Sequence, residues 1–325
     1  MPLIQAQKLK EMAISYLERS GISSDHARII ADVLVEAELR GKNTHGLIRL
    51  EKIRSRYQRV RRSEIKVVKR FANHILIDGG NNLGYVVAYL AAQRAIGLAR
   101  QYGSAMVGAF NTTHCGMLGY YTDMIRREDM IGAATCNCYP RVAPLGGVEP
   151  IFGTNPLSVA IPTGEDPPLL FDASLASITN GRLMLMSEKN ERMPTGLAFD
   201  EEGNPTDDPK KALSGAVRPF GDHKGYGLML ISQILTTALL GATLIPPPGR
   251  EYGFLIMAVN PEIFIPIDRF KEKVSKLIEK VKFVKREPGI EEILLPGERS
   301  WKIRCKRLKE GIDLDEKLIE RIEDR

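Results

Sequence analysis

The sequence has little cysteine, and nothing in it resembles a metal-binding or disulfide-bonded framework. Its 325 residues include four cysteines, at positions 115, 136, 138 and 305. These are too few and too scattered for a set of structural disulfides. Only Cys136 and Cys138 lie close together, and no second Cys/His pair at zinc-finger spacing accompanies them. We therefore expect buried thiols and no metal site.

The N-terminus also lacks the apolar core of a signal peptide or membrane span. Residues 1–21, MPLIQAQKLKEMAISYLERSG, are amphipathic and carry charges throughout. The sequence therefore predicts a cytoplasmic protein with no membrane partner. Hydrophobic residues make up 43% of the chain and charged residues 26%, which is typical of a folded globular protein with a sizeable core.

Two nucleotide-binding motifs are absent as well. No G-x-G-x-x-G follows a predicted strand, and there is no G-x-x-x-x-G-K-[ST]. A nucleotide that binds this chain must therefore use a different architecture.

The excess of positive charge is local. The net charge is +6, and many of the basic residues lie in segments 54–70 and 271–309. In the second segment glutamates alternate with the lysines, as on a solvated helix face. We therefore predict no nucleic-acid partner and favour small anionic molecules as ligands.

Hydrophobic periodicity predicts a mixed α/β core with helical ends. An apolar stripe and a Ser-Ser-Asp start predict a helix over 23–41, and a second helix is expected over 45–60. Residues 187–215 are polar and punctuated by Pro and Gly, so we expect mostly loop there. The apolar helix over 223–242 is expected at the centre of the core. The remaining predicted helices cover 84–103, 117–127 and the C-terminal segment, and the predicted strands lie within 64–80, 104–110, 130–138, 157–163, 168–174 and 253–261.

A threonine, a histidine and an arginine form the first candidate site. If a helix begins near Thr44, His45 and Arg49 share one face of it, because they are four residues apart. Arg49 could then hold a carboxylate in a bidentate fork while His45 exchanges a proton with a neighbouring oxygen. The alternative is that Thr44 caps the helix and His45 is an ordinary residue of its first turn.

His114 lies in NTTHCGMLGYY, directly after a predicted strand, where catalytic groups of α/β proteins often occur. A loop histidine bonded to the backbone is the alternative. Two further turns are polar. GTNP, with Thr154 and Asn155, could bond a ligand or serve only as a turn. GDHKGYG opens a helix, so His223 and Lys224 could bind phosphate there, although Asp222 disfavours an anion.

In this order and spacing, these motifs resemble the type 2 malate/L-lactate dehydrogenase family. The similarity runs over nearly the whole chain, through ADVLVEAELRGKNTHGLIRL, NTTHCGMLGYY, NCYPRVAPLGGVEPIFGTNPLSVAIPT, FDASLAS, HKGYGL and LLPGE. The resemblance implies an NAD(P)-binding α/β fold that is not of the Rossmann type, with a mixed sheet core, and a homodimer. It divides the chain into a helical part over 1–66, a central NAD(P)-binding domain over 67–260, and a helical part over 261–325 that packs back on the first.

The resemblance also implies roles for individual residues. His114 would be the acid/base group, His45 would assist it, and Arg49 and Thr44 would bind the substrate carboxylate. Contacts with NAD or NADP would fall on Cys138, Thr154, Asn155, Asp172, Ala173, Ser174, His223, Lys224 and Gly225.

The implied reaction interconverts a small 2-hydroxy acid of the malate, sulfolactate or lactate type and its 2-oxo acid. A cyclic-imine reductase or a ureidoglycolate dehydrogenase is the alternative within the family. A non-catalytic paralogue is a third, because residues 173–176 read Ala-Ser-Leu-Ala where the family usually has Met-Ala-Thr-Ser. Cys115 likewise replaces a usual phenylalanine.

Overall fold

A seven-stranded mixed sheet forms the centre of the chain. The computed structural model describes residues 3–323, and its strand order is β2-β3-β4-β11-β5-β6-β7. The pair β3 and β4 is parallel, whereas the other neighbours are antiparallel. The strands are β2 (Lys66–Phe71), β3 (His74–Asp78), β4 (Ser104–Thr112), β5 (Ile131–Cys136), β6 (Leu157–Ile161), β7 (Leu169–Ala173) and β11 (Tyr252–Val259).

These pairings bring several loops to one edge of the sheet. Strand β11 is antiparallel to both β4 and β5, so β4 and β5 run in the same direction. Strand β7 shares that direction through β6. The loops that follow β4, β5 and β7, and the residues that precede β6 and β11, therefore meet at the same edge. His114, Cys138, Thr154 and Ser174 belong to these segments, and Tyr252 begins β11 at the same edge.

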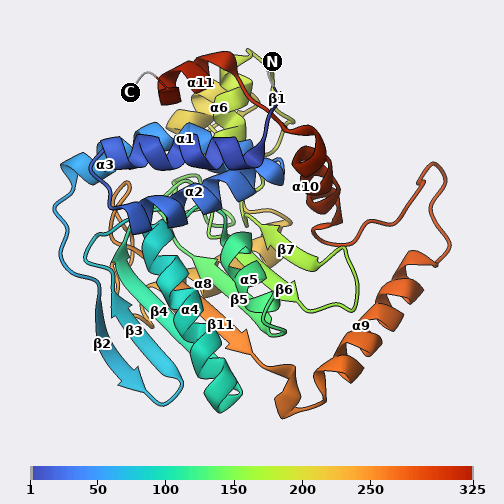
Figure 1. Cartoon of the computed structure of the whole chain (residues 1–325). Coiled ribbons are helices and arrows are strands. Elements are labelled where there is room, and N and C mark those ends of the chain that lie inside the picture. The colour runs from blue at the N-terminus through green and yellow to red at the C-terminus, as the bar shows by residue number, and fades with distance from the viewer. Residues whose placement is uncertain (1–2, 324–325) are drawn as a thin grey trace.

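Helices cover both faces of the sheet. Helices α4 (Gly84–Tyr102) and α5 (Leu118–Arg126) pack on one face, and α8 (Asp222–Thr236) packs on the other (Figure 1). Alanines line the buried side of α4, so the helix can approach the sheet closely. Strand β11 is apolar and almost entirely buried, as expected for a strand covered on both faces.

The N-terminal helices and the end of the chain pack together over the sheet (Figure 1). Strand β1 (Leu3–Ile4) pairs with β12 (Ile312–Asp313). Helix α11 (Glu316–Glu323) contacts α1 (Ala6–Arg19), and α10 (Glu298–Glu310) contacts α2 (Ser24–Leu39). Buried ions reinforce this contact, because Glu36 of α2 accepts from Arg40 at 2.7 Å and from Arg304 of α10 at 2.8 Å. The helical character of both ends is confirmed, while the domain boundaries at 66/67 and 260/261 stay predictions.

The prediction of a single helix over 45–60 is wrong. Two 3₁₀ turns, η1 (Asn43–His45) and η2 (Leu47–Arg49), precede the helix α3 (Leu50–Arg59). Gly46 separates the turns with ψ of −148°, which no α-helix allows.

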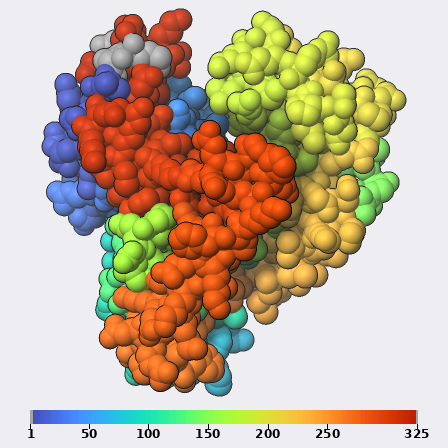
Figure 2. Space-filling model, turned by 90° about the vertical axis from the view of Figure 1, so that its right-hand side faces the viewer, coloured from blue at the N-terminus to red at the C-terminus, as the bar shows by residue number. Residues whose placement is uncertain are grey.

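Residues 187–215 contain more structure than the predicted loop. With their neighbours they form a small lobe with its own apolar core, which includes Phe152, Leu175, Leu183 and Met229. Figure 2 shows this lobe in yellow-green, set apart at the top from the N- and C-terminal helices. Its elements are α6 (Asn180–Glu188), β8 (Ala198–Phe199), β9 (Pro205–Thr206), α7 (Pro209–Ser214) and β10 (Ala216–Val217).

The expectation that the apolar helix α8 lies at the centre of the core is also wrong. Its polar residues Ser232, Gln233 and Thr236 are buried, while Ile231 and Ile234 are 55% and 50% exposed. The reason is that the polar side chains have partners inside. Gln233 accepts from Asn155 at 2.8 Å, and Ser232 bonds Thr135. The apolar side chains therefore face outward in the single chain.

Helix α9 (Ile267–Lys282) follows the 3₁₀ turn η3 (Pro261–Ile263) and projects from the body (Figure 1). None of its residues is buried, which agrees with the expected solvated helix. No helix within residues 3–323 is long and apolar enough to cross a membrane.

Candidate active site

A cavity of about 1090 Å³ opens at the edge of the sheet where the loops meet. Segment 42–60, the loops after β4, β5 and β7, and residues 179–181 of the lobe contribute to its lining. The cavity thus brings together residues of the motifs NTHGLIRL, NTTHCG and GTNP. The predicted residues that line it are Thr44, His45, Arg49, His114, Cys138, Thr154, Asp172 and Ser174.

The two histidines face each other in this cavity. The rings of His45 and His114 stack with their centroids 5.7 Å apart and their planes at 28°. The N–H of Gly116 donates to Nδ1 of His114 at 3.1 Å, and the hydroxyl of Tyr85 lies 3.3 Å from the same nitrogen. Since a backbone N–H can only donate, the neutral ring carries its proton on Nε2. Within the described part of the chain Nε2 has no hydrogen-bond partner. His114 thus bonds the backbone and also lines the cavity, and its catalytic role stays a prediction.

Burial and nearby cations keep both imidazoles neutral. Burial lowers the pKa of His114 well below its usual value, and Arg49, His45, Lys52 and Arg56 lower it further. Burial, followed by Arg49, lowers the pKa of His45 to about 4, against the opposing effect of Asp172.

Arg49 is held by its own turn. Its Nε donates to the carbonyl of Thr44 at 2.6 Å, and the hydroxyl of Thr44 lies 3.2 Å from Nδ1 of His45. The 3₁₀ turns, rather than a shared helix face, thus bring the three side chains to the cavity. Among residues 3–323 no hydrogen bond occupies the two terminal nitrogens of Arg49.

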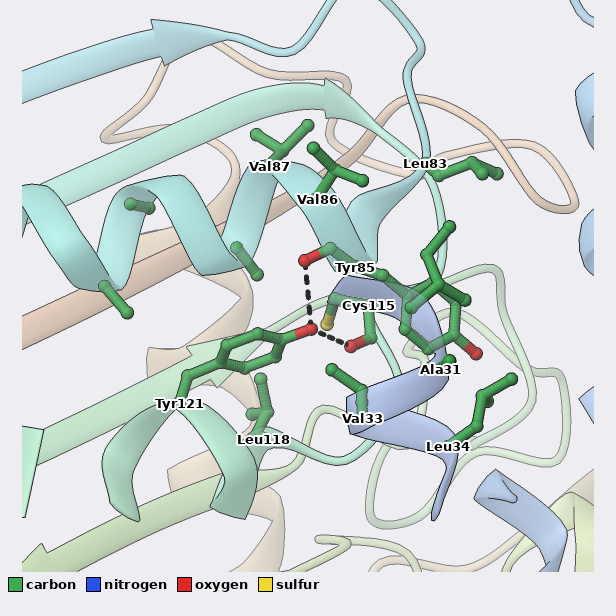
Figure 3. Close-up of a cluster of buried hydrophobic side chains, with 14 of the residues drawn as sticks. Ala31, Val33, Leu34, Leu83, Tyr85, Val86, Val87, Cys115, Leu118 and Tyr121 are labelled. Atoms are coloured by element: carbon green, nitrogen blue, oxygen red, sulfur yellow. Dashed lines mark hydrogen bonds between the residues drawn. The ribbon is translucent and has the colours of Figure 1, made fainter. Parts of the chain in front are cut away.

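The loop that carries His114 rests on the core. Figure 3 shows the hydroxyl of Tyr121, which donates to the carbonyl of Cys115 at 2.6 Å and to that of Tyr85 at 3.3 Å. Cys115 is itself buried in the main core. A single tyrosine therefore fixes the backbone beside His114 relative to the helix that supplies Tyr85.

Lys42 and Asp172 form an ion pair in the lining of the same cavity. Nζ of Lys42 lies 2.6 Å from Oδ2 of Asp172. Gly119 at the start of α5 leaves room for this carboxylate, because a Cβ there would lie 2.9 Å from Oδ2. Burial raises the pKa of Cys138, so its sulfur, 3.8 Å from the hydroxyl of Thr154, remains a thiol.

The other predicted cofactor residues do not line the cavity. Asn155 is fully buried and bonds Gln233 and the carbonyl of Met229. Ala173 ends β7, while His223 and Lys224 are exposed at the start of α8. Gly225 is packed against Phe220, with a Cβ position 1.8 Å from its carbonyl oxygen. Their cofactor roles stay predictions.

Sequence reasoning missed several residues that line the cavity, chiefly Lys42, Lys52, Tyr85, Arg56 and Arg141. Lys52 and Arg56 belong to α3 and follow Arg49 at intervals of three and four. This helical spacing, hidden within a segment that looked generally basic, was the available signal.

The cavity has the size and charge that a dinucleotide requires. Its volume of about 1090 Å³ lies just above the range for small-molecule sites, which is about 300–1,000 Å³. Its lysines and arginines can bind phosphates. Within residues 3–323 no group of three or more His, Cys, Asp or Glu side chains could hold a metal ion.

Comparison with known proteins identifies the family. The profile of the malate/L-lactate dehydrogenase family matches residues 4–323. The chain belongs to this family. A malate/(S)-sulfolactate dehydrogenase of Methanothermus fervidus is 37% identical, over 99% of this chain and 96% of the relative. The ureidoglycolate dehydrogenase (NAD(+)) of Escherichia coli K12 is 29% identical, over 96% and 92%.

A solved structure confirms the fold. The sulfolactate dehydrogenase from Methanocaldococcus jannaschii superposes with a TM-score of 0.90 at 34% identity, covering 99% of this chain and 96% of that one. The expected mixed α/β dehydrogenase fold, distinct from the Rossmann type, is therefore present.

The low pKa values lead to a direct test. Between pH 5.5 and 8 neither His45 nor His114 should take up a proton, because burial and cations disfavour the imidazolium of both. Nitrogen-15 NMR of the labelled imidazoles, followed by pH titration, measures this. A ring that titrates near pH 6.5, the usual value for histidine, would contradict the assignment for that residue.

Proposed function

We propose that the cavity catalyses the NAD(P)-dependent interconversion of a small 2-hydroxy acid and its 2-oxo acid, with His114 as the acid/base group. The observation that carries the proposal is the neutral His114, which presents Nε2–H in a buried cavity beside the anchored guanidinium of Arg49. The family and its dehydrogenase relatives support the reaction class.

The chain's own residues would divide the work as follows. Arg49 binds the substrate carboxylate in a fork and so orients the neighbouring carbon. In reduction, Nε2–H of His114 donates a hydrogen bond to the carbonyl oxygen of the substrate. An anionic substrate bound at Arg49 would favour the imidazolium of His114, and this form would give the proton that the product hydroxyl requires and return to the neutral ring. The surrounding Arg49, Lys52 and Arg56 disfavour an imidazolium but stabilise negative charge that develops on that oxygen. When bound, the nicotinamide supplies the hydride in this direction and accepts it in the other.

NAD or NADP is the redox partner. Its position in the cavity would be set by Cys138, Thr154, Asp172 and Ser174, which lie together on one side. Which of the two cofactors binds is open, since the cavity cations could serve either.

The unusual stretch 173–176 does not argue strongly for a non-catalytic protein. Ser174 still lines the cavity, and its hydroxyl accepts from the N–H of Ala176 at 3.0 Å. Leu175 and Ala176 are buried in the core of the lobe. The two hydroxyls missing relative to the usual family sequence are therefore replaced by apolar contacts inside the lobe, away from the cavity.

The substrate is proposed to carry two negative charges. Lys52 and Arg56 stand beyond Arg49 on the cavity wall and act electrostatically on His114. One arginine suffices for a 2-oxo carboxylate, so these two cations suit a second carboxylate or a sulfonate. A substrate of the malate or sulfolactate type fits this arrangement better than lactate, and better than a cyclic imine with a single carboxylate.

We propose that the protein is a cytoplasmic homodimer whose subunits meet through α8. The apolar side chains Leu228, Ile231 and Ile234 of α8, with Leu239 just after its end, are exposed in the single chain. The family resemblance favours a second copy as the partner.

The acid/base role is tested by His114→Ala. We expect kcat for reduction of the best 2-oxo acid to fall by roughly 10²- to 10⁴-fold, the usual contribution of a positioned general acid. The measurement follows loss of nicotinamide absorbance for oxaloacetate, sulfopyruvate and pyruvate with NADH and NADPH. Near-normal turnover by the variant would exclude His114 from this role.

Substrate charge is tested by Lys52→Met and Arg56→Met. Each should raise KM for a dianionic 2-oxo acid at least about tenfold, as expected for loss of one charge-assisted contact worth about 1.5–3 kcal/mol, with little change for pyruvate. Lys8→Met on the exposed side of α1 is the control for general charge. Equal effects on both substrate classes would contradict a second anion site.

The dimer is tested by Ile231→Glu. A charge in the middle of the α8 surface should convert the protein to a monomer in sedimentation-equilibrium measurements, whereas Leu277→Glu on α9 should not. A wild-type protein that sediments as a monomer would contradict the proposal.

A further inference from the structure

Glu38 is a buried carboxylate next to the turns that carry His45 and Arg49. It lies near the end of α2 and is 1% exposed. Its Oε1 accepts from the N–H of Leu47 at 2.9 Å, where η2 begins. Among the described residues Oε2 has no hydrogen-bond partner. The hydrogen bond from Leu47 is therefore the one that the structure gives for the buried carboxylate among the described residues, and it joins Glu38 to the turns that carry His45 and Arg49.

Gly46 lies at the junction of η1 and η2, and the side chain of Glu38 fills the space that a Cβ at this position would need. A Cβ at position 46 would lie 1.9 Å from Oε1 and 2.3 Å from Cδ of Glu38. The φ of Gly46 is −89°, which any residue can adopt. The requirement for glycine thus comes from the carboxylate and not from the backbone angle.

Helix α10 fixes the same junction from the other side. Nη1 of Arg307 donates to the backbone carbonyl of Glu38 and, at 3.2 Å, to Oδ1 of Asn43. The turn from Asn43 to Arg49 is therefore held between α2 and α10, with Glu38 at the point where η1 passes into η2.

We propose that Glu38 is a positioning residue for the dehydrogenase reaction, which sets the angle between η1 and η2 through Leu47 and so fixes Arg49 relative to His45 and His114. This inference rests on the proposed function. Glu38 does not line the cavity, so it acts only through the turn.

The contact should depend on pH. Burial raises the pKa of Glu38 to about 7, although the Leu47 N–H and Arg307 oppose the shift. Arg307 of α10 is the charged side chain that acts on Glu38, while the neighbouring turns also carry His45 and Arg49, and α10 carries Arg304. A hydrogen bond to a carboxylate is about twice as strong as one to a neutral acid. The turn is therefore held more firmly above pH 7 than below it.

The raised pKa of Glu38 affects the free energy of unfolding in the opposite direction to its effect on the turn. Because the folded pKa is higher than the unfolded one, the folded chain binds more protons between about pH 4.5 and 7. The stability that Glu38 contributes is complete below its unfolded pKa and is lost as the pH rises through about 7. Ionisation of Glu38 above pH 7 thus lowers the stability of the fold but strengthens the hydrogen bond that holds the turn.

The test compares Glu38→Gln, Glu38→Leu and the control Glu36→Gln. Glutamine keeps an acceptor for Leu47 but cannot ionise, whereas leucine removes the acceptor. Glu36 lies on the same helix and is largely buried, but it bonds Arg40 and Arg304 instead of the turn. KM and kcat for a 2-oxo acid are measured from pH 5.5 to 8.5, with hydrogen exchange of the amides of residues 43–50 and thermal unfolding over the same range.

In the wild type we expect KM to rise several-fold as the pH falls through 7, with a smaller change in kcat. Glu38→Gln should remove this inflection and should unfold at a higher temperature than the wild type above pH 7. Glu38→Leu should raise KM at least tenfold at every pH and accelerate exchange of the Leu47 amide. Glu36→Gln should keep the wild-type pH profile.

A wild-type KM and a wild-type Leu47 exchange rate in Glu38→Leu would overturn the proposal, as would an inflection that persists in Glu38→Gln. Failure of the proposed function is distinguishable from this. If the wild type reduces no 2-oxo acid, two readouts without turnover still report on Glu38. The exchange rate of the Leu47 amide reports whether Glu38 holds the turn, and the calorimetric affinity for oxalate, a small dicarboxylate, reports whether Arg49 is held in position to bind an anion.

Discussion

The contact between the rings of His45 and His114 joins the N-terminal turns to a loop of the central sheet. His45 comes from the turns below α2, and His114 comes from the loop after β4. Neither segment could form the cavity alone, since the turns contribute the guanidinium of Arg49 and the loop contributes a proton on Nε2. The closure of the N- and C-terminal helices over the sheet therefore assembles the site as well as stabilising the fold. Hydrogen bonds from Tyr121, Gly116 and Thr44 fix the backbone or ring on each side of the contact.

The charges around this contact explain why both rings remain neutral. Three cations of segment 49–56 act on His114, whereas the carboxylate of Asp172 is already paired with Lys42. An imidazolium placed between them would be desolvated and repelled. A developing oxyanion at the same position would be attracted. The cavity is therefore organised for negative charge, which agrees with an anionic substrate and with a phosphate-bearing cofactor.

Much of this arrangement could be predicted from the sequence. The order of strands and helices along the chain follows from periodicity and turn residues, and the antiparallel placement of β11 then brings the loops of His114, Cys138 and Ser174 to one edge. The motif NTHGLIRL pointed to His45 and Arg49. It could not reveal that two 3₁₀ turns present them, because that geometry depends on how Glu38 packs against Gly46 and on Arg307, which is distant in the chain.

Helix α8 shows the limit of pattern reasoning most clearly. Its apolar residues predicted a central position, but Asn155 and Thr135 offer hydrogen bonds that draw Gln233 and Ser232 inward. A buried amide that finds a partner costs little, whereas one left unpaired costs about 1–3 kcal/mol. The helix therefore turns its polar side to the core, and its apolar side faces outward. Hydrophobicity alone predicted a covered apolar face here, but it could not tell that this chain leaves that face exposed.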